Sequence, residues 1–233
     1  MPIVLACAVN GERNAICAGL AVPESAAAGR TIAVNGREAA LLCTGIGPVN
    51  AAWRLGELLP LLSGVTGVVN LGIAGSYDLT RAPLLSPVAA TAEIWPEFGL
   101  RLSEDVDPLA LGFPLHPKGP VHDALGLDPA LAAEAMGLTL PGSWRKAPSV
   151  TVAGVSADAR RAAHLAASRR ALTENMEGFP LALICHDKGL PFLEVRVVSN
   201  LAGSRAASDW RLKDALRELG RVASVLFGLR EEA

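Results

Sequence analysis

Charge, aromatic rings and paired cysteines are all scarce in this chain of 233 residues, and each shortage excludes a class of protein. Charged residues make up 19% of the chain, the net charge is −2 and no basic block occurs, so we expect no nucleic-acid partner held through its phosphates. Aromatic residues make up 4%, too few for a platform that stacks single-stranded bases. Hydrophobic residues make up 51%, which excludes a disordered chain.

The cysteines and histidines lack the spacing of a metal site or of a disulfide framework. The four cysteines are scattered without a C-x-x-C pair, a pattern typical of buried thiols in a reducing compartment. The four histidines likewise share no spacing typical of metal ligands. We therefore expect a cytoplasmic protein that uses neither a metal nor another cofactor.

Signals for export and for membrane insertion are also weak. Residues 1–5 carry no positively charged side chain and are typical of a first strand, not of a signal peptide. Residues 58–77 are uncharged over a length that could span a bilayer, but proline and several glycines interrupt them. This favours a helix end, a turn and a buried strand, so we expect a soluble protein with no membrane partner.

Short apolar runs alternate with segments of helical pattern along the chain, which predicts an α/β fold with a central mixed, largely parallel sheet flanked by helices. No repeat or linker divides it, so one domain is expected over residues 1–233. Asn35-Gly36 predicts a hairpin, residues 72–75 a glycine-rich turn, and residues 94–149 mostly long loops. The expected strands are 2–9, 31–34, 38–43, 65–71, 149–153 and 191–198. The expected helices are 12–20, 49–62, 127–136, 158–169, 177–188 and 208–229.

Polar residues follow several predicted strands, where α/β sheets bind their ligands. Glu12 follows the first strand, the glycine-rich segment follows the 65–71 strand, and Ser199-Asn200 follow the 191–198 strand. Glu177 begins a helix. These positions supply two carboxylates and one amide, a set suited to one small polar ligand.

Met176-Glu177-Gly178 and Ser199-Asn200, about twenty residues apart, resemble the ribose-binding and base-binding motifs of the nucleoside phosphorylase/nucleosidase family. The resemblance covers most of the chain. It implies a nucleoside-phosphorylase-like three-layer α/β fold, a purine nucleoside as the small-molecule partner, no cofactor, and a homo-oligomer of two or more subunits.

The resemblance also implies a role for each matching residue. Glu12 is similar to a glutamate that activates water, and Asn200 is similar to the residue that binds the leaving base, so these two would be catalytic. Glu177 would accept hydrogen bonds from the ribose hydroxyls and oppose the positive charge that develops on the sugar. The full set of expected substrate-binding residues is Met176, Glu177, Arg196, Ser199, Ile73, Ala74, Gly75 and Arg205.

Position 200 predicts which purine is bound. A 6-oxopurine offers a carbonyl acceptor at C6 and can gain a proton at N7, and the asparagine amide can meet both groups because it carries a donor and an acceptor. An adenine nucleoside would instead suit an aspartic acid that protonates N7. Residues 174–216 look most like the branch of the family that hydrolyses futalosine, a 6-oxopurine nucleoside of menaquinone biosynthesis.

Other functions stay open from the sequence. Residues 70–73 lack the arginine and serine with which phosphorylases of this family hold phosphate, although Arg13 and Ser76 lie nearby, so hydrolysis is preferred to phosphorolysis. A methylthioadenosine/S-adenosylhomocysteine-type nucleosidase and a purine nucleoside phosphorylase are the enzyme alternatives. Phe179-Pro180 and Ala206-Ala207 depart from the family pattern, which leaves a noncatalytic nucleoside-binding protein as the alternative of another class.

Overall fold

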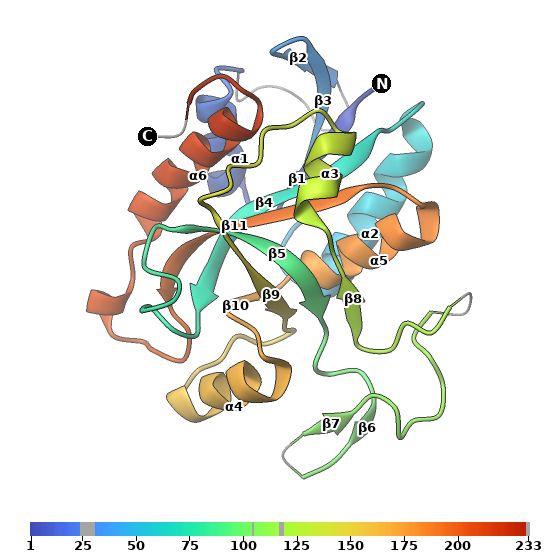
Figure 1. Cartoon of the computed structure of the whole chain (residues 1–233), viewed down its shortest axis with the longest axis vertical. Helices are drawn as coiled ribbons and strands as arrows, with labels where there is room; N and C mark the ends of the chain where they lie inside the picture. The colour runs from blue at the N-terminus through green and yellow to red at the C-terminus, as the bar shows by residue number, and fades with distance from the viewer. Residues whose placement is uncertain (24–30, 104, 117–118, 232–233) are drawn as a thin grey trace.

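The computed structural model describes residues 1–23, 31–103, 105–116 and 119–231, and places a mixed sheet between helices (Figure 1). The strands of this sheet are β1 (Ile3–Cys7), β2 (Thr31–Val34), β3 (Arg37–Cys43), β4 (Gly67–Ser76), β5 (Pro87–Ile94), β8 (Ala124–Gly126), β9 (Arg145–Thr151), β10 (Thr173–Asn175) and β11 (Phe192–Leu201). The helices are α1 (Asn10–Gly19), α2 (Pro48–Leu58), α3 (Pro129–Ala135), α4 (Ala159–Arg169), α5 (Gly178–Lys188) and α6 (Leu212–Leu226).

The sheet combines an open edge with a closed ring of strands. Its order is β10-β9-β5-β11-β4-β1-β3-β2, with β8 added beside β5. Because β10 pairs with β4 as well as with β9, the strands β10, β9, β5, β11 and β4 close on themselves. Among the described residues, five pairings of this sheet are parallel and four antiparallel. The predicted α/β class with a central mixed sheet is confirmed.

Separate apolar layers cover the two faces of the sheet. Ile16 of α1 and Leu219 of α6 belong to the core on one face, together with side chains of α3. Leu55 of α2 and Leu181 of α5 belong to the core on the other face. All four side chains are fully buried, and burial of each stabilises the fold by about 1.5–3 kcal/mol. This packing fixes the starts of α1 and α5 against the sheet.

Several predicted elements lie close to where the sequence placed them. The Asn35-Gly36 turn joins β2 and β3 in an antiparallel hairpin. Asp158 caps α4, where its carboxylate accepts a hydrogen bond of 2.9 Å from the backbone N–H of Arg161. Pro48 occupies the first turn of α2, whose predicted span ends in a short 3₁₀ turn at Leu59–Leu61.

The predicted glycine-rich turn at residues 72–75 is wrong, because β4 continues without a break to Ser76. Gly72 is paired with Arg196 of β11, and Gly75 is paired with both Asn200 of β11 and Glu174 of β10. These glycines therefore lie inside the ring of strands, where the backbones of neighbouring strands approach closely. The sequence also missed β5 and β10, and it ended the last strand too early, since β11 extends through Ser199 and Asn200 to Leu201.

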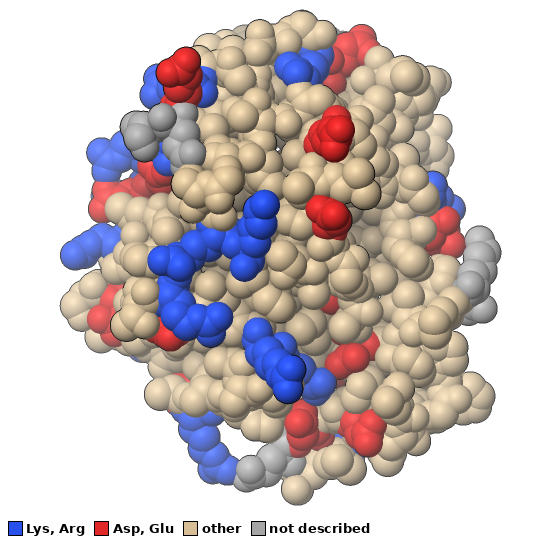
Figure 2. Space-filling model, viewed as in Figure 1, with Lys and Arg blue, Asp and Glu red and all other residues tan. Residues whose placement is uncertain are grey.

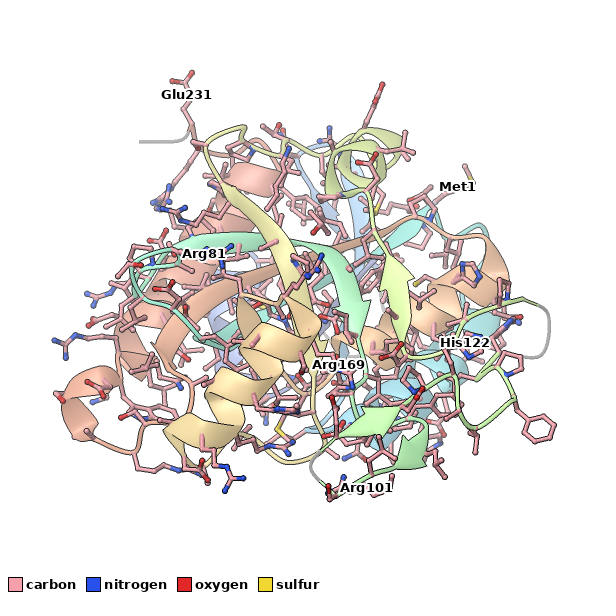
Figure 3. All side chains as sticks on the ribbon, turned by 60° about the horizontal axis from the view of Figure 1, so that its bottom comes forward. Met1, Arg81, Arg101, His122, Arg169 and Glu231 are labelled. Atoms are coloured by element: carbon pink, nitrogen blue, oxygen red, sulfur yellow. The ribbon has the colours of Figure 1, made fainter. Side chains whose placement is uncertain are left out.

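Residues 94–149 are more ordered than the predicted long loops. They contain the hairpin of β6 (Leu100–Arg101) and β7 (Val106–Asp107), followed by β8, α3 and the start of β9. Arg169, at the end of α4, connects to this region (Figure 3). Its guanidinium donates to Asp105 at 3.0 Å and to Asp123 at 2.9 Å.

Basic side chains gather mostly on the left half of the face in Figure 2, and acidic side chains lie among them and on its right half. No helix within the described ranges combines the length and the apolar character needed to cross a membrane.

Candidate active site

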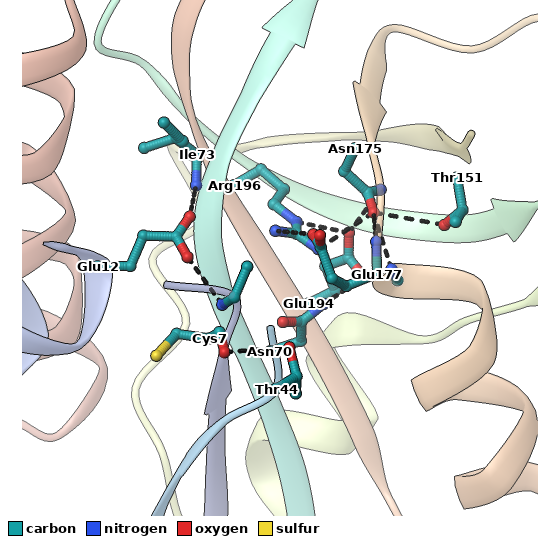
Figure 4. Close-up of polar contacts among 12 residues, drawn as sticks. Cys7, Glu12, Thr44, Asn70, Ile73, Thr151, Asn175, Glu177, Glu194 and Arg196 are labelled. Atoms are coloured by element: carbon teal, nitrogen blue, oxygen red, sulfur yellow. Dashed lines mark hydrogen bonds and ion pairs between the residues drawn. The ribbon is translucent and has the colours of Figure 1, made fainter. Parts of the chain in front are cut away.

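Most of the predicted site residues come from α1, β4, β11 and the start of α5. Figure 4 shows four of them, Glu12, Ile73, Glu177 and Arg196, close together. β1 leads into α1, and β10 leads through Met176 into α5, so two chain segments turn into helices at this place. The ends of β4 and β11 lie between them as parallel neighbours. The arrangement joins two helix starts to two strand ends.

Glu12 lies in the first turn of α1 and is only 3% exposed. Its Oε2 accepts hydrogen bonds from the backbone N–H groups of Ala8, at 2.8 Å, and Val9, at 3.2 Å. Its Oε1 accepts from the backbone N–H of Ile73 in β4, at 2.9 Å. The start of a helix favours a negative charge, so this carboxylate is held in place by both its position and its three donors.

Glu177 lies at the N-cap of α5 and is 5% exposed. Its Oε1 accepts a hydrogen bond of 3.0 Å from the backbone N–H of Gly47, and its Oε2 lies 3.7 Å from Nη1 of Arg196. Burial raises the pKa of this carboxyl above its usual 4.5, while the Arg196 charge acts in the opposite direction. The Glu177 carboxylate is thus fixed from two sides.

Arg196 is a buried cation between the carboxylates of Glu12 and Glu177, with 1% of its surface exposed. Its Nε donates to Glu194 at 3.0 Å and its Nη2 donates to the side-chain oxygen of Asn175 at 3.2 Å. A Cβ added to Gly72 would clash with Nη1 of Arg196 and would lie 2.8 Å from Oε1 of Glu12. Glycine at position 72 therefore allows the guanidinium and the Glu12 carboxylate to approach the same point on β4.

Ser199 and Asn200 follow Arg196 on β11, beside an irregularity in the pairing with β4 between Val198 and Asn200. The Ser199 hydroxyl lies 3.2 Å from the carbonyl of Ala74 and 2.8 Å from Oδ1 of Asn200. The Asn200 amide donates to the carbonyl of Leu201 at 3.1 Å. Asn200 is half-buried.

The remaining predicted residues are less closely connected. Met176 is half-buried and packs against an apolar cluster that includes Val150 and Val152. Ile73 and Gly75 contribute backbone and space rather than polar side chains. Arg205 is exposed on the segment after β11, and no hydrogen bond or ion pair joins it to the other site residues in the described part of the chain.

Polar residues beneath the site were given no role by the sequence. Glu93, Thr151, Asn175 and Glu194 form a buried network under Arg196 and the start of α5. Charged or amide side chains inside strand-length apolar runs were the available signal, because such groups are rarely buried without partners.

The unusual Phe179 after the Met-Glu-Gly motif is 1% exposed and packs in the core, 6.0 Å from the ring of Trp95. Phe179 is therefore a core residue of α5, on the side of the helix that packs against the sheet.

A surface hollow of about 780 Å³ lies between α2 and α5, but none of the predicted site residues lines it. Its wall is mostly aliphatic, and its charged or titratable side chains are those of His116, Asp187 and Lys188. A nucleoside needs several converging hydrogen-bonding groups. The end of the strands provides these groups, and the hollow does not.

Curated relatives of this chain are nucleosidases. The futalosine hydrolase of Streptomyces coelicolor is 32% identical over 97% of this chain and 97% of its own length. The futalosine hydrolase of Thermus thermophilus is 37% identical over 76% of both chains. A 5′-methylthioadenosine/S-adenosylhomocysteine nucleosidase of Halalkalibacterium halodurans is 29% identical over 74% of this chain and 72% of its own.

Solved structures share the fold at lower identity. The methylthioadenosine/S-adenosylhomocysteine nucleosidase of Neisseria meningitidis, in complex with methylthio-immucillin-A, has a TM-score of 0.74 at 20% identity and covers 96% of this chain and 97% of that one. A futalosine hydrolase mutant of Helicobacter pylori has a TM-score of 0.71 at 18% identity, with coverages of 96% and 95%. The family model of the phosphorylase superfamily matches residues 2–231. The chain therefore belongs to the phosphorylase superfamily.

Proposed function

We propose that this protein is a purine nucleosidase that hydrolyses the N-glycosidic bond of futalosine, releasing hypoxanthine and dehypoxanthine futalosine in menaquinone biosynthesis. The observation that carries the proposal is the convergence of Glu12 and Glu177 on either side of buried Arg196, with Asn200 at the same strand end. The 32% identity to a futalosine hydrolase over nearly the whole chain supports this substrate.

Glu177 is the proposed ribose-binding residue. Its carboxylate has one backbone donor and one distant guanidinium, which leaves acceptor positions for sugar hydroxyls. A negative charge at this point also opposes the positive charge that develops on the ribosyl group as the base leaves. Met176 precedes Glu177 and is proposed to pack against the sugar.

Glu12 is the proposed general base. A carboxylate offers about four acceptor positions, and three backbone N–H groups occupy positions on Glu12. The remaining position can accept a hydrogen bond from water and remove its proton during attack on the sugar, a contribution of about 10²–10⁴-fold in rate. The backbone of Ile73, Ala74 and Gly75 is proposed to line the path between this water and the base.

Asn200 is the proposed partner of the leaving hypoxanthine. Its Oδ1 accepts from Ser199 and one N–H donates to Leu201, so one N–H and one acceptor position remain for the purine. Ser199 thereby orients the amide. Arg205 is the candidate for contact with the acidic end of futalosine.

Water is preferred to phosphate as the nucleophile. Ser76 is fully buried and its hydroxyl accepts the backbone N–H of Asp78 at 3.2 Å. Arg13 directs its guanidinium to the side chain of Asn14, at 3.4 Å. No hydrogen bond or ion pair within the described residues joins Ser76 or Arg13 to Arg196. A methylthioadenosine/S-adenosylhomocysteine-type nucleosidase is the second candidate, favoured by the Halalkalibacterium halodurans relative.

We further propose that the protein is a homo-oligomer of at least two subunits. Each subunit would consist of one domain, and the protein would act in the cytoplasm. Ile46, Val49 and Trp53 are exposed apolar side chains beside Gly47, and a second subunit would cover them. The family model that spans residues 2–231 supports a single domain.

Hydrolysis of futalosine is tested by incubating the purified protein with futalosine, inosine and methylthioadenosine, each with and without phosphate. Released base and sugar are separated by chromatography. We expect release of hypoxanthine from futalosine at the same rate in both buffers, because water is the proposed nucleophile. A requirement for phosphate, or release from methylthioadenosine alone, would contradict the proposed reaction.

Replacing Glu177 with glutamine keeps the shape of the side chain and removes its charge. We expect kcat/KM for futalosine to fall by about 10²–10³-fold with little change in the melting temperature. Because burial raises the pKa of Glu177, the wild-type kcat/KM should fall with decreasing pH while the pH is still above 4.5. The matched control is Glu134→Gln on the exposed side of α3. Wild-type turnover in Glu177→Gln would refute the ribose-binding role.

Replacing Asn200 with aspartate tests how the purine is chosen. An aspartic acid can protonate N7 of adenine but loses the amide donor that suits a 6-oxopurine. We expect the ratio of kcat/KM for methylthioadenosine to that for futalosine to rise about tenfold, equivalent to a hydrogen-bond difference of about 1.4 kcal/mol. An unchanged ratio would show that position 200 does not select the base.

A further inference from the structure

Two glutamates beneath the site, Glu93 of β5 and Glu194 of β11, have no part in the proposed chemistry. Both are 0% exposed, and the two carboxyl groups lie side by side, since the side-chain nitrogen of Asn175 is within hydrogen-bonding distance of both. A Cβ added to Gly178 would clash with both carboxyl groups, so the pair lies directly against the start of α5. Two adjacent carboxyl groups that are buried away from solvent cannot both stay ionised, because solvent does not screen the repulsion between their charges.

The charges around the pair agree with one bound proton. Arg196 is held by Glu194 at 3.0 Å and lies 3.7 Å from Glu177, and the Glu12 charge also acts on it. These three carboxylates already exceed the single positive charge of Arg196. Burial, followed by the charge of Glu194, raises the pKa of Glu93 well above its usual value. We assign the proton to Glu93, so that Glu194 stays ionised as the partner of Arg196.

One route leads from the pair to Glu177 through Asn175. The side-chain nitrogen of Asn175 lies 2.8 Å from Glu93, 2.9 Å from the Ser149 hydroxyl and 3.2 Å from Glu194. Its side-chain oxygen accepts the backbone N–H of Glu177 at 2.9 Å and of Gly178 at 2.8 Å. The acid pair thus sets the orientation of the amide, and the amide holds the backbone that carries the Glu177 carboxylate.

A second route leads through Thr151 and a third through Arg196. The Thr151 hydroxyl lies 2.5 Å from Glu93 and accepts the backbone N–H of Phe179, at 2.7 Å, in the first turn of α5. Glu194 holds the guanidinium of Arg196, which faces the Glu177 carboxylate. All three routes end at the start of α5.

We propose that Glu93 and Glu194 share one proton and act as positioning residues, which fix the Glu177 carboxylate against the ribose through Asn175, Thr151 and Arg196. The inference rests on the proposed ribose-binding role of Glu177. Such positioning is worth a large factor in rate, since misplacement of a reacting group by about 1 Å can cost about 10²-fold.

Two substitutions of Glu93 separate this role from others. Glutamine reproduces the shape and the donor of a protonated glutamic acid, whereas aspartate keeps an ionisable group but is shorter by one methylene. We expect Glu93→Gln to retain kcat for futalosine within about threefold, and Glu93→Asp to lose about 10–100-fold in kcat with a smaller change in KM. The matched control is Glu97→Gln, in the same segment but bound to Arg161.

The proposal is decided by which of the two variants, Glu93→Gln or Glu93→Asp, has the higher kcat. Aspartate more active than glutamine would mean that Glu93 acts as an anion, and equal wild-type activity in both would mean that it does not position the site. Either result overturns the inference. Melting temperatures of all variants accompany the kinetics, so that a loss of kcat is not confused with unfolding.

Infrared difference spectroscopy tests the shared proton without turnover. The difference between wild type and Glu93→Gln at neutral pH should contain the carbonyl stretch of a protonated carboxylic acid, and the difference between wild type and Glu97→Gln should not. Absence of the band from the first difference overturns the proton-sharing pair. If the wild type does not hydrolyse futalosine, the proposed function fails, while this band still decides the state of Glu93.

Discussion

The buried guanidinium of Arg196 is the constraint on which the rest of the site depends. A charge removed from water costs several kcal/mol unless partners compensate it, and Arg196 is 1% exposed. Glu194, two residues earlier on the same strand, supplies the close partner at 3.0 Å. Glu177 supplies a second from the start of α5, at 3.7 Å. Pairing across these elements fixes α5 relative to the sheet, and the carboxylates of Glu12, the proposed general base, and Glu177, the proposed ribose-binding residue, lie on either side of this one cation.

Glycines provide the space that this arrangement needs. Gly72 lies opposite Arg196 in the pairing of β4 and β11, and a side chain there would displace both the guanidinium and Glu12. Gly178 follows Glu177, and a side chain there would collide with Glu93 and Glu194. Both positions require glycine for a reason that does not involve turn geometry. They keep charged side chains in contact with the backbone where no methyl group fits.

The sequence predicted the alternation of strands and helices, the hairpin and the starts of α1 and α5, because local periodicity and turn chemistry determine them. It failed at residues 72–75, since two glycines within four residues are typical of a turn, and the sequence does not show that Arg196 lies opposite Gly72. It assigned roles to Glu12, Glu177 and Asn200 from their motifs, and these roles stay predictions. It could not identify Glu93 as a buried residue beneath the site. The burial of Glu93 depends on β5 lying between β9 and β11, and these strands are far from β5 in the sequence.

A crystal structure of the protein with a C-nucleoside analogue of inosine, whose carbon–carbon bond cannot be hydrolysed, is the most direct test of the site. The expected result places both ribose hydroxyls within hydrogen-bonding distance of the Glu177 carboxylate and the purine beside Asn200. It also places an ordered water or the sugar carbon next to Glu12, with Arg196 still bound to Glu194. An analogue bound in the hollow between α2 and α5, or with its ribose away from Glu177, would contradict the assignment of the active site.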